Sequence, residues 1–204
     1  MRRAARGMMR GMDELILLRH GETEWSRAGR HTGRTDVPLT ERGEEEALGL
    51  APLLKRRDLA LVVVSPALRA RRTAELAGLT DYETTPDLWE WDYGGYEGRT
   101  TPEIREARPG WYLWRDGVPP GDADHPGESV EEVGRRVERV VARVKGAAGD
   151  VVLVAHGHVL RVLTARWLGL PAADGRLFSL YTGTYSVLGF EHEEQVIRRW
   201  NAPV

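Results

Sequence analysis

LILLRHG, residues 15–21, is the stretch that decides the fold, because a continuous aliphatic run stops abruptly at His-Gly. The same pattern returns at residues 151–157 as VVLVAHG. Continuous aliphatic runs of this length are typical of strands that are covered on both faces, as in a parallel sheet. In such sheets the ligand site lies just beyond the carboxyl ends of the strands. The repetition therefore predicts that His20 and His156 face one another across one pocket.

Strands and helices alternate along the rest of the chain. The patterns predict strands at residues 13–19, 59–65, 151–155, 185–191 and 196–200, the last two as a hairpin. They predict helices at residues 40–54, 66–77, 129–146 and 157–168. The helix at 129–146 has the clearest pattern, because valines recur every three or four residues behind a Ser-x-x-Glu capping box. This alternation predicts an α/β fold, a three-layer α/β/α sandwich on a mainly parallel sheet.

Two segments stand apart from this alternation. Residues 82–128 are rich in Gly, Pro and aromatic residues, and we expect them to form an irregular lid or substrate segment. Residues 1–11 are basic and lack the apolar centre of a signal peptide, so a disordered tail is expected there. The remaining chain, residues 12–204, is expected to form one domain.

Composition limits the function classes. A formal net charge of −2 gives no general attraction to nucleic acid or to an anionic membrane, and neither is expected as a partner. The chain has no Cys, which excludes thiol catalysis, disulfides and thiolate metal sites. No run of about 18 apolar residues occurs, so we expect a cytoplasmic, enzyme-like domain. The sequence does not determine the oligomeric state and leaves a homodimer open.

Cationic side chains collect at the predicted strand ends. Arg19 and His20 end the first strand, and His156 ends the third. Arg69 lies in the first turn of the helix that follows the second strand. Helix N-termini at the same edge add unpaired amides and partial positive charge. Because the planar fork of Arg makes paired hydrogen bonds to phosphate, the sequence predicts an anion site suited to phosphate.

Four motifs follow one another along this part of the chain. They are LRHGET at residues 18–23, SPALRARRTA at 65–74, LWEWDYGGYEG at 88–98 and VAHGH at 154–158. Together they resemble the signature motifs of the histidine phosphatase superfamily, also called the phosphoglycerate-mutase-like family. A single Arg-His-Gly is weak evidence, whereas four matches in the right order are specific. The resemblance covers about residues 15–168 and points to the phosphatase branch.

The resemblance implies a role for each residue at this edge, and it implies no cofactor and no metal. His20 would be the nucleophile that attacks phosphorus and forms a phosphohistidine. Its attacking nitrogen must be unprotonated, so the other nitrogen should donate to a backbone carbonyl or a similar group. Glu90 would protonate the leaving alkoxide and then deprotonate the attacking water. Bound phosphoryl oxygens would be stabilised by Arg19, Arg69 and His156.

The resemblance also reaches the loop after the first strand. RHTG at residues 30–33 matches a family loop that closes over the phosphate or the rest of the substrate, which makes Thr32 and Gly33 expected contacts. Many members have Asn six residues after the nucleophilic His, where this chain has Ser26. A hydroxyl can still hydrogen-bond a phosphate oxygen with a shorter reach, so Ser26 is carried over as a substrate-binding residue.

Several of these residues have competing assignments. The two histidines and a nearby carboxylate could instead hold a metal. Arg19 and Arg69 oppose this, because two unit charges about 4 Å apart interact by about 4 kcal/mol at an effective dielectric constant near 20. Asp92 is a rival proton donor, although the family position favours Glu90. His158 is expected to be structural rather than catalytic.

A phosphohistidine can pass its phosphoryl group to water or to another hydroxyl. Mutases of the family tend to carry a basic, proline-rich insertion between the acid motif and the second histidine, and this chain lacks one. The expected function is therefore a metal-independent phosphomonoesterase acting on small phosphorylated metabolites of the sugar phosphate or bisphosphate type. The alternatives are phosphoglycerate mutase-type transfer, an α-ribazole-phosphate phosphatase and, more remotely, a phosphate-binding module without turnover.

Overall fold

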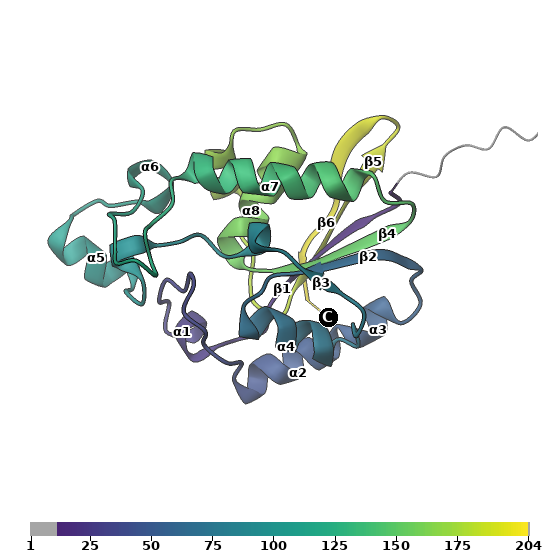
Figure 1. Ribbon diagram of the computed structural model, residues 1–204, viewed down its shortest axis with the longest axis horizontal. Helices are drawn as coiled ribbons and strands as arrows, with labels where there is room; N and C mark the ends of the chain where they lie inside the picture. The colour runs from purple at the N-terminus through teal and green to yellow at the C-terminus, as the bar shows by residue number, and fades with distance from the viewer. Residues whose placement is uncertain (1–11, 204) are drawn as a thin grey trace, which may run out of the picture.

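A six-stranded sheet in the order β3-β2-β4-β1-β5-β6 forms the middle of the molecule (Figure 1). The computed structural model describes residues 12–203, so the tail predicted at residues 1–11 lies outside the described residues. The strands are β1 Leu15–Arg19, β2 Leu59–Val64, β3 Glu83–Thr84, β4 Asp150–Ala155, β5 Tyr185–Glu191 and β6 Glu194–Ala202. The first four strands of this order are parallel, and β5 and β6 form an antiparallel hairpin beside β1.

Helices cover both faces of the sheet. One face carries α7 Val130–Lys145 and α8 Gly157–Trp167, and the other carries α2 Glu41–Gly49, α3 Ala51–Leu54 and α4 Leu68–Leu76 (Figure 1). The shorter elements are α1 Glu24–Arg27, α5 Thr101–Ala107, α6 Leu113–Asp116 and the 3₁₀ turns η1 Pro86–Leu88, η2 Gly94–Tyr96 and η3 Ala172–Leu177. The predicted three-layer sandwich on a mainly parallel sheet is confirmed. None of the described helices is both long and apolar enough to cross a membrane.

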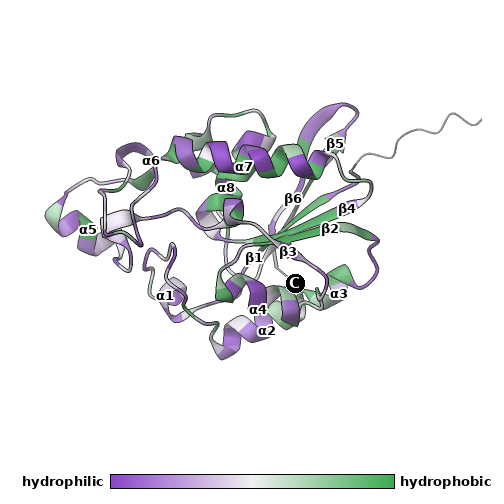
Figure 2. Cartoon of the chain, viewed as in Figure 1, coloured by the Kyte–Doolittle hydropathy of each residue, from purple (hydrophilic) through white to green (hydrophobic). Residues whose placement is uncertain are grey.

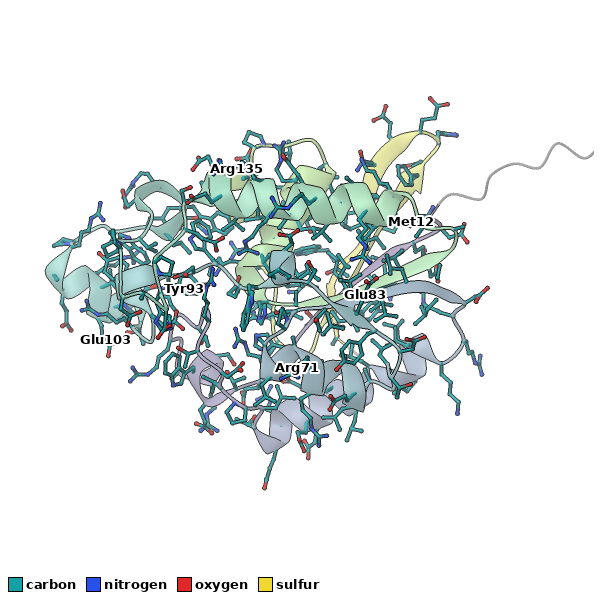
Figure 3. The ribbon with its side chains drawn as sticks, viewed as in Figure 1. Met12, Arg71, Glu83, Tyr93, Glu103 and Arg135 are labelled. Carbon is teal, nitrogen blue, oxygen red and sulfur yellow. The ribbon has the colours of Figure 1, made fainter. Side chains whose placement is uncertain are left out.

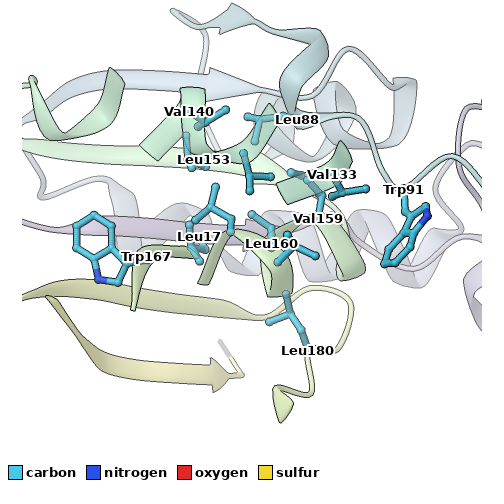
Figure 4. Packing of buried hydrophobic residues seen from close by; sticks show 14 of the residues in the cluster. Leu17, Leu88, Trp91, Val133, Val140, Leu153, Val159, Leu160, Trp167 and Leu180 are labelled. Atoms are coloured by element: carbon cyan, nitrogen blue, oxygen red, sulfur yellow. The ribbon is translucent and has the colours of Figure 1, made fainter. Parts of the chain in front are cut away.

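The aliphatic run of β1 fills two cores at once. Leu15 and Leu17 pack into the cluster under α7 and α8, whereas Ile16 and Leu18 pack into the cluster over α2 to α4. All four side chains are fully buried, and burying each contributes roughly 1.5–3 kcal/mol. Figure 4 shows the first cluster around Leu17, and Figure 2 shows the hydrophobic colour gathered over β1, β2 and β4. A strand covered on both faces therefore has no polar alternation.

Several elements differ from the sequence prediction. The helix expected at residues 40–54 is two helices, because the chain turns at Leu50 ahead of Pro52. The helix expected from residue 66 begins at Leu68, since residues 65–67 form the turn out of β2. The two-residue strand β3 lies in the segment that was expected to be irregular.

After β3, residues 85–128 leave the sheet and extend from the end where the strands of the parallel part finish (Figure 1). Their tryptophans anchor them: Trp91 is fully buried, and its indole Nε1 donates to the carbonyl oxygen of Glu128 at 2.8 Å. In Figure 3, Tyr93 lies where this segment meets the body of the molecule and Glu103 lies near its outer end. That the segment acts as a lid stays a prediction.

Candidate active site

His20 lies directly beyond the carboxyl end of β1, next to His156 at the end of β4. The centroids of the two imidazole rings are 5.1 Å apart, so the two strand ends do share one site. Nδ1 of His20 lies 2.8 Å from the carbonyl oxygen of Gly21. A carbonyl only accepts, so Nδ1 carries the proton and Nε2 keeps its lone pair. A nucleophilic histidine needs this tautomer.

Burial and charge keep His20 neutral. The residue is only 5% exposed. Burial lowers the pKa of His20 well below its ordinary value of 6.5, and the guanidinium groups of Arg69 and Arg19 lower it further. A protonated imidazole would be a third cation in the same small volume. Nε2 of His20 is therefore unprotonated at neutral pH.

His156 is held differently from its counterpart. Nε of Arg69 donates to Nδ1 of His156 at 3.1 Å, so the proton of this ring lies on Nε2. Nε2 in turn donates to Oγ of Ser65 at 2.7 Å. The side chain is fully buried and does not line the cavity in front of His20. Binding of a phosphoryl oxygen by His156 stays a prediction, because its one N–H is directed at Ser65 here.

The cavity in front of His20 has a volume of about 190 Å³. Of the residues predicted from the sequence, it is lined by Arg19, His20, Ser26, Thr32 and Glu90. Nη1 of Arg19 donates to the carbonyl oxygen of Leu180. Nε of Arg19 is buried and has no hydrogen-bond partner in the described part of the chain. Arg19 lines the cavity, and its guanidinium charge suits a phosphoryl group.

Glu90 is the one carboxylate among the lining residues. Its Oε1 accepts from the amides of Trp91 at 2.9 Å and Val159 at 2.8 Å, and its Oε2 accepts from the amide of His158 at 2.9 Å. Two of these amides belong to the first turn of α8, which has no cap from its own residues. Glu90 thus caps a helix from a distant part of the chain, which places its carboxylate beside the cavity.

Arg69 acts from behind the cavity, which it does not line. Besides His156, its guanidinium donates to the carbonyl oxygens of Thr32 at 3.2 Å, Gly33 at 2.9 Å and Thr35 at 3.0 Å. Four of the five N–H groups are thereby used, and one on Nη1 remains. Arg69 thereby holds the loop at residues 32–35 against α4 and contributes positive charge to the site. Direct contact between Arg69 and substrate stays a prediction.

The three loop residues carried over from the family lie in different places. Thr32 lines the cavity. Ser26 also lines it, but its hydroxyl belongs to the capping box of α1, accepting from the amide of Thr23 and donating to its carbonyl. Gly33 does not line the cavity, and its amide lies 2.9 Å from both carboxylate oxygens of Glu97. The structure therefore brings Thr32 and Ser26, but not Gly33, to the site.

The competing assignments can be placed as well. Asp92 lies outside the lining of the cavity, where its Oδ1 accepts from the amides of Gly94 and Gly127 and its Oδ2 lies 2.9 Å from Nε of Arg34. His158 lines the cavity, and its Nδ1 is hydrogen-bonded to the hydroxyl of Tyr93 at 2.6 Å. Within residues 12–203, no three side chains of His, Asp or Glu gather in a way that could hold a metal ion.

Sequence reasoning missed the side chain that holds the Glu90 segment. Arg136 on α7 donates to the carbonyl oxygens of Asp87, Trp89 and Glu90 at 2.6–3.1 Å. It also forms a fork with both carboxylate oxygens of Glu128 at 2.8 and 3.0 Å. Arg136 is 7% exposed. The available signal was an arginine next to the valine stripe of the predicted helix, a position where a cation needs buried acceptors.

The other missed residues line the cavity itself. They are Arg30, His31, Tyr93, Arg161 and Leu180. Burial lowers the pKa of His31 to about 4, so its ring is a neutral part of the wall. These side chains come from loops and from the second turn of α8, where no periodic pattern marks them. The arrangement as a whole offers a neutral histidine, guanidinium groups and one carboxylate to a small anion.

Comparison with known proteins agrees with this chemistry. The sequence matches the histidine phosphatase superfamily (branch 1) over residues 15–203. An acid phosphatase of Mycobacterium tuberculosis is 46% identical over 182 residues, which cover 87% of each chain. The sedoheptulose 1,7-bisphosphatase of Saccharomyces cerevisiae is 37% identical over 188 residues, which cover 76% of this chain and 67% of the relative.

The same agreement appears among solved structures. The product of an open reading frame of Mycobacterium tuberculosis superimposes with a TM-score of 0.86 at 43% identity, covering 94% of this chain and 98% of that chain. The chain belongs to the histidine phosphatase superfamily, as its motifs predicted. It is an enzyme that hydrolyses phosphate esters.

Proposed function

We propose that this protein is a metal-independent phosphomonoesterase that hydrolyses small phosphorylated metabolites, of the sugar phosphate or bisphosphate type, through a phosphohistidine on His20. One observation carries the proposal. The neutral ring of His20 keeps a free Nε2 in a small cavity that also holds Arg19 and a single carboxylate, that of Glu90. A nucleophile, an anion-binding cation and a proton donor are the three parts that covalent phosphoryl transfer needs.

In the first step, Nε2 of His20 attacks phosphorus as the bond to the ester oxygen breaks. The leaving alkoxide takes a proton from Glu90. Oε2 is the suitable oxygen, because it accepts one amide hydrogen bond while Oε1 accepts two. The positive charges of Arg19 and Arg69 stabilise the negative charge that spreads over the phosphoryl oxygens.

In the second step, water replaces the alcohol. Glu90, now ionised, takes a proton from the water as its oxygen attacks phosphorus and the bond to Nε2 breaks. Phosphate leaves, and the lone pair of Nε2 is restored with Glu90 protonated again. The hydrogen bond from Nδ1 to the carbonyl oxygen of Gly21 holds the ring in one orientation through both steps. The protein supplies all of these groups, so no metal is needed.

The cavity supports a small, polar substrate. Its volume of about 190 Å³ suits a metabolite rather than a phosphorylated protein surface. Arg30 and Arg161 line it in addition to the catalytic groups, and hydroxylated or anionic alcohols match such donors. The name of the yeast relative, sedoheptulose 1,7-bisphosphatase, indicates a sugar bisphosphate as the substrate of that protein.

The experiment is a phosphatase assay with trapping of the intermediate. The purified protein should release nitrophenol from 4-nitrophenyl phosphate in the presence of EDTA. With a radioactive phosphate ester, rapid denaturation should trap label that is stable in alkali and lost in acid, as a phosphohistidine is. Dependence on an added metal, or turnover without a labelled enzyme, would refute the mechanism. Stimulation by bisphosphoglycerate with little hydrolysis would identify a mutase instead.

A further inference from the structure

A second cavity adjoins the first. Each has a volume of about 190 Å³, and the two share the lining residues His31, His158 and Arg161. The other sides of the second cavity come from the segment that carries α5 and α6, including Arg105 and Tyr112. A substrate with its phosphoryl group beside the nucleophile can therefore place the far end of its alcohol part in this second space.

Arg161 is the cation common to both cavities, and its guanidinium is held in place. It lies over the indole ring of Trp114, 4.8 Å from the ring centroid. Its Nε and Nη2 donate to the carbonyl oxygens of Gly175 at 3.1 Å and Arg176 at 3.3 Å. Nη1 makes no hydrogen bond with the described residues. Three contacts thus orient a guanidinium whose remaining nitrogen is left for a ligand.

The charge in the second cavity is unbalanced. Arg105 and Arg161 both line it, and none of its lining residues is acidic. Nε of Arg105 donates to the carbonyl oxygen of Trp111 at 2.9 Å, which holds this second cation at the cavity. The partly buried Arg136 has a carboxylate partner in Glu128. Arg161 has none within 4 Å in the described chain, so a ligand anion is the missing partner.

We propose that the second cavity binds a second anionic group of the substrate, so that the preferred substrates are phosphomonoesters whose alcohol part carries another phosphate or a carboxylate. Arg161 and Arg105 bind that group while the transferred phosphoryl group lies beside His20. His31 and His158 form the neutral, aromatic surface between the two anions, since burial lowers the pKa of both rings. The inference rests on the proposed phosphatase function and names its substrate class.

The test uses pairs of substrates that differ by one anionic group. One pair is 3-phosphoglycerate and glycerol 3-phosphate, and the other is fructose 1,6-bisphosphate against its two monophosphates. We expect the wild type to prefer the doubly anionic member in kcat/KM. Arg161→Met should lower this preference about 10- to 100-fold, mainly through KM, because a charged hydrogen bond to the far group is lost.

Two further variants distinguish loss of the far-group contact from a general effect of the substitution on folding. Arg105→Gln, at an exposed position that lines only the second cavity, should lower the same preference by a smaller factor. Arg71→Met removes a charge from the exposed face of α4 (Figure 3) at a residue that lines neither cavity, and should leave the preference unchanged. Thermal unfolding of each variant shows whether it is folded.

The outcomes separate the inference from the proposed function. If the variants lose the preference for only one of the two pairs, that pair shows whether the far group is a carboxylate or a phosphate. Equal preference for all substrates in the wild type, or an equal fall on both members of each pair in the Arg161 and Arg105 variants, overturns the inference while hydrolysis stands. If the wild type hydrolyses neither these esters nor 4-nitrophenyl phosphate, the proposed function fails and the inference fails with it.

Discussion

The two His-Gly strand ends share a sequence pattern and a place in the sheet, but they differ in what surrounds them. β1 and β4 are parallel neighbours, with Arg19 opposite Ala155. After β1 the chain enters a loop, whereas after β4 it enters α8 at once. His20 keeps a free nitrogen at the cavity, and both nitrogens of His156 are hydrogen-bonded inside the protein. The His-Gly motif thus predicts where each histidine lies in the sheet, whereas its hydrogen bonds determine which of the two can be the nucleophile.

The glycines of the two motifs differ in the same way. A Cβ on Gly21 would collide with the backbone carbonyl of Gly43, so this glycine lets the loop after β1 pass close to α2. A Cβ on Gly157 would lie 3.3 Å from the guanidinium carbon of Arg19. The second glycine therefore leaves room for the cation that reaches the cavity. Gly21 thus allows close packing of the backbone, whereas Gly157 makes space for a side chain of the site.

The largest effect should come from His20. Replacing it by Ala removes the nucleophile and should lower kcat on 4-nitrophenyl phosphate by about 10⁴-fold or more, as is typical when a covalent nucleophile is lost. Steady-state release of nitrophenol measures the effect, and far-UV circular dichroism shows whether the variant is folded. A folded His20→Ala protein with activity close to wild type would mean that the roles of the two strand ends are assigned wrongly.

Glu90 bridges the two strand ends, because its carboxylate accepts amides from α8. Glu90→Gln keeps the shape but cannot move a proton, and we expect hydrolysis of an alkyl phosphate to fall by about 10²–10⁴-fold. Formation of the phosphoenzyme from 4-nitrophenyl phosphate should be affected far less, since nitrophenolate leaves without a proton. A burst of nitrophenolate, followed by slow turnover, is the expected trace. Loss of the burst would contradict the assigned role.

Much of the fold was predictable, because strands buried on both faces appear in the sequence as continuous aliphatic runs. The aliphatic runs that end at His20 and His156 predicted two strands of a parallel sheet whose ends share one site, and the valine stripe predicted α7. The break at Leu50 and the short strand β3 were not predicted. A two-residue strand has no periodicity of its own, and its existence depends on pairing with a neighbour.

The site was predictable where it lies at strand ends and unpredictable where loops build it. Ser26 was expected to contact phosphate, but its hydroxyl forms the capping box with Thr23, a competing hydrogen bond that the chain makes locally. The hold of Arg136 on the Glu90 segment joins residues far apart in the sequence, with no motif to mark the pair. Arg161 faces two cavities because of how the segment at residues 82–128 folds back.

A substitution of His156, which lies beside the nucleophile but does not line the cavity, tests the difference between the two strand ends. His156→Gln should lower kcat about 10²-fold, the size expected for loss of one charge-stabilising donor, and so much less than His20→Ala. The variant should still form the phosphoenzyme, which radioactive trapping measures. A loss as large as that of His20→Ala, with no trapped label, would show that His156 carries the phosphoryl group or that the site has collapsed.

A smaller effect is expected at Arg136, which positions Glu90 through the backbone. Arg136→Lys keeps the charge but loses the fork to Glu128, and it should slow hydrolysis of an alkyl phosphate about tenfold. Hydrolysis of 4-nitrophenyl phosphate should fall less, because its leaving group needs no proton. Arg139→Lys is the control, since Arg139 is exposed, forms an ion pair with Asp87 and donates to the carbonyl oxygen of Arg135 on its own helix. Equal losses on both substrates would indicate a merely structural role.

The histidines at the two strand ends have one property in common, because both rings are buried. Burial lowers the pKa of both His20 and His156 well below 6.5, so below that pH the unfolded chain binds protons that the folded protein does not. The contribution of these histidines to the free energy of unfolding is therefore complete above pH 6.5. It falls as the pH drops, by up to about 1.4 kcal/mol per pH unit for each histidine. Removing either ring should flatten this slope by the same amount, although the two variants differ widely in activity. Urea unfolding at about pH 7 and about pH 5.5 measures it. A slope unchanged in one variant but not in the other would mean that its histidine is protonated in the folded state.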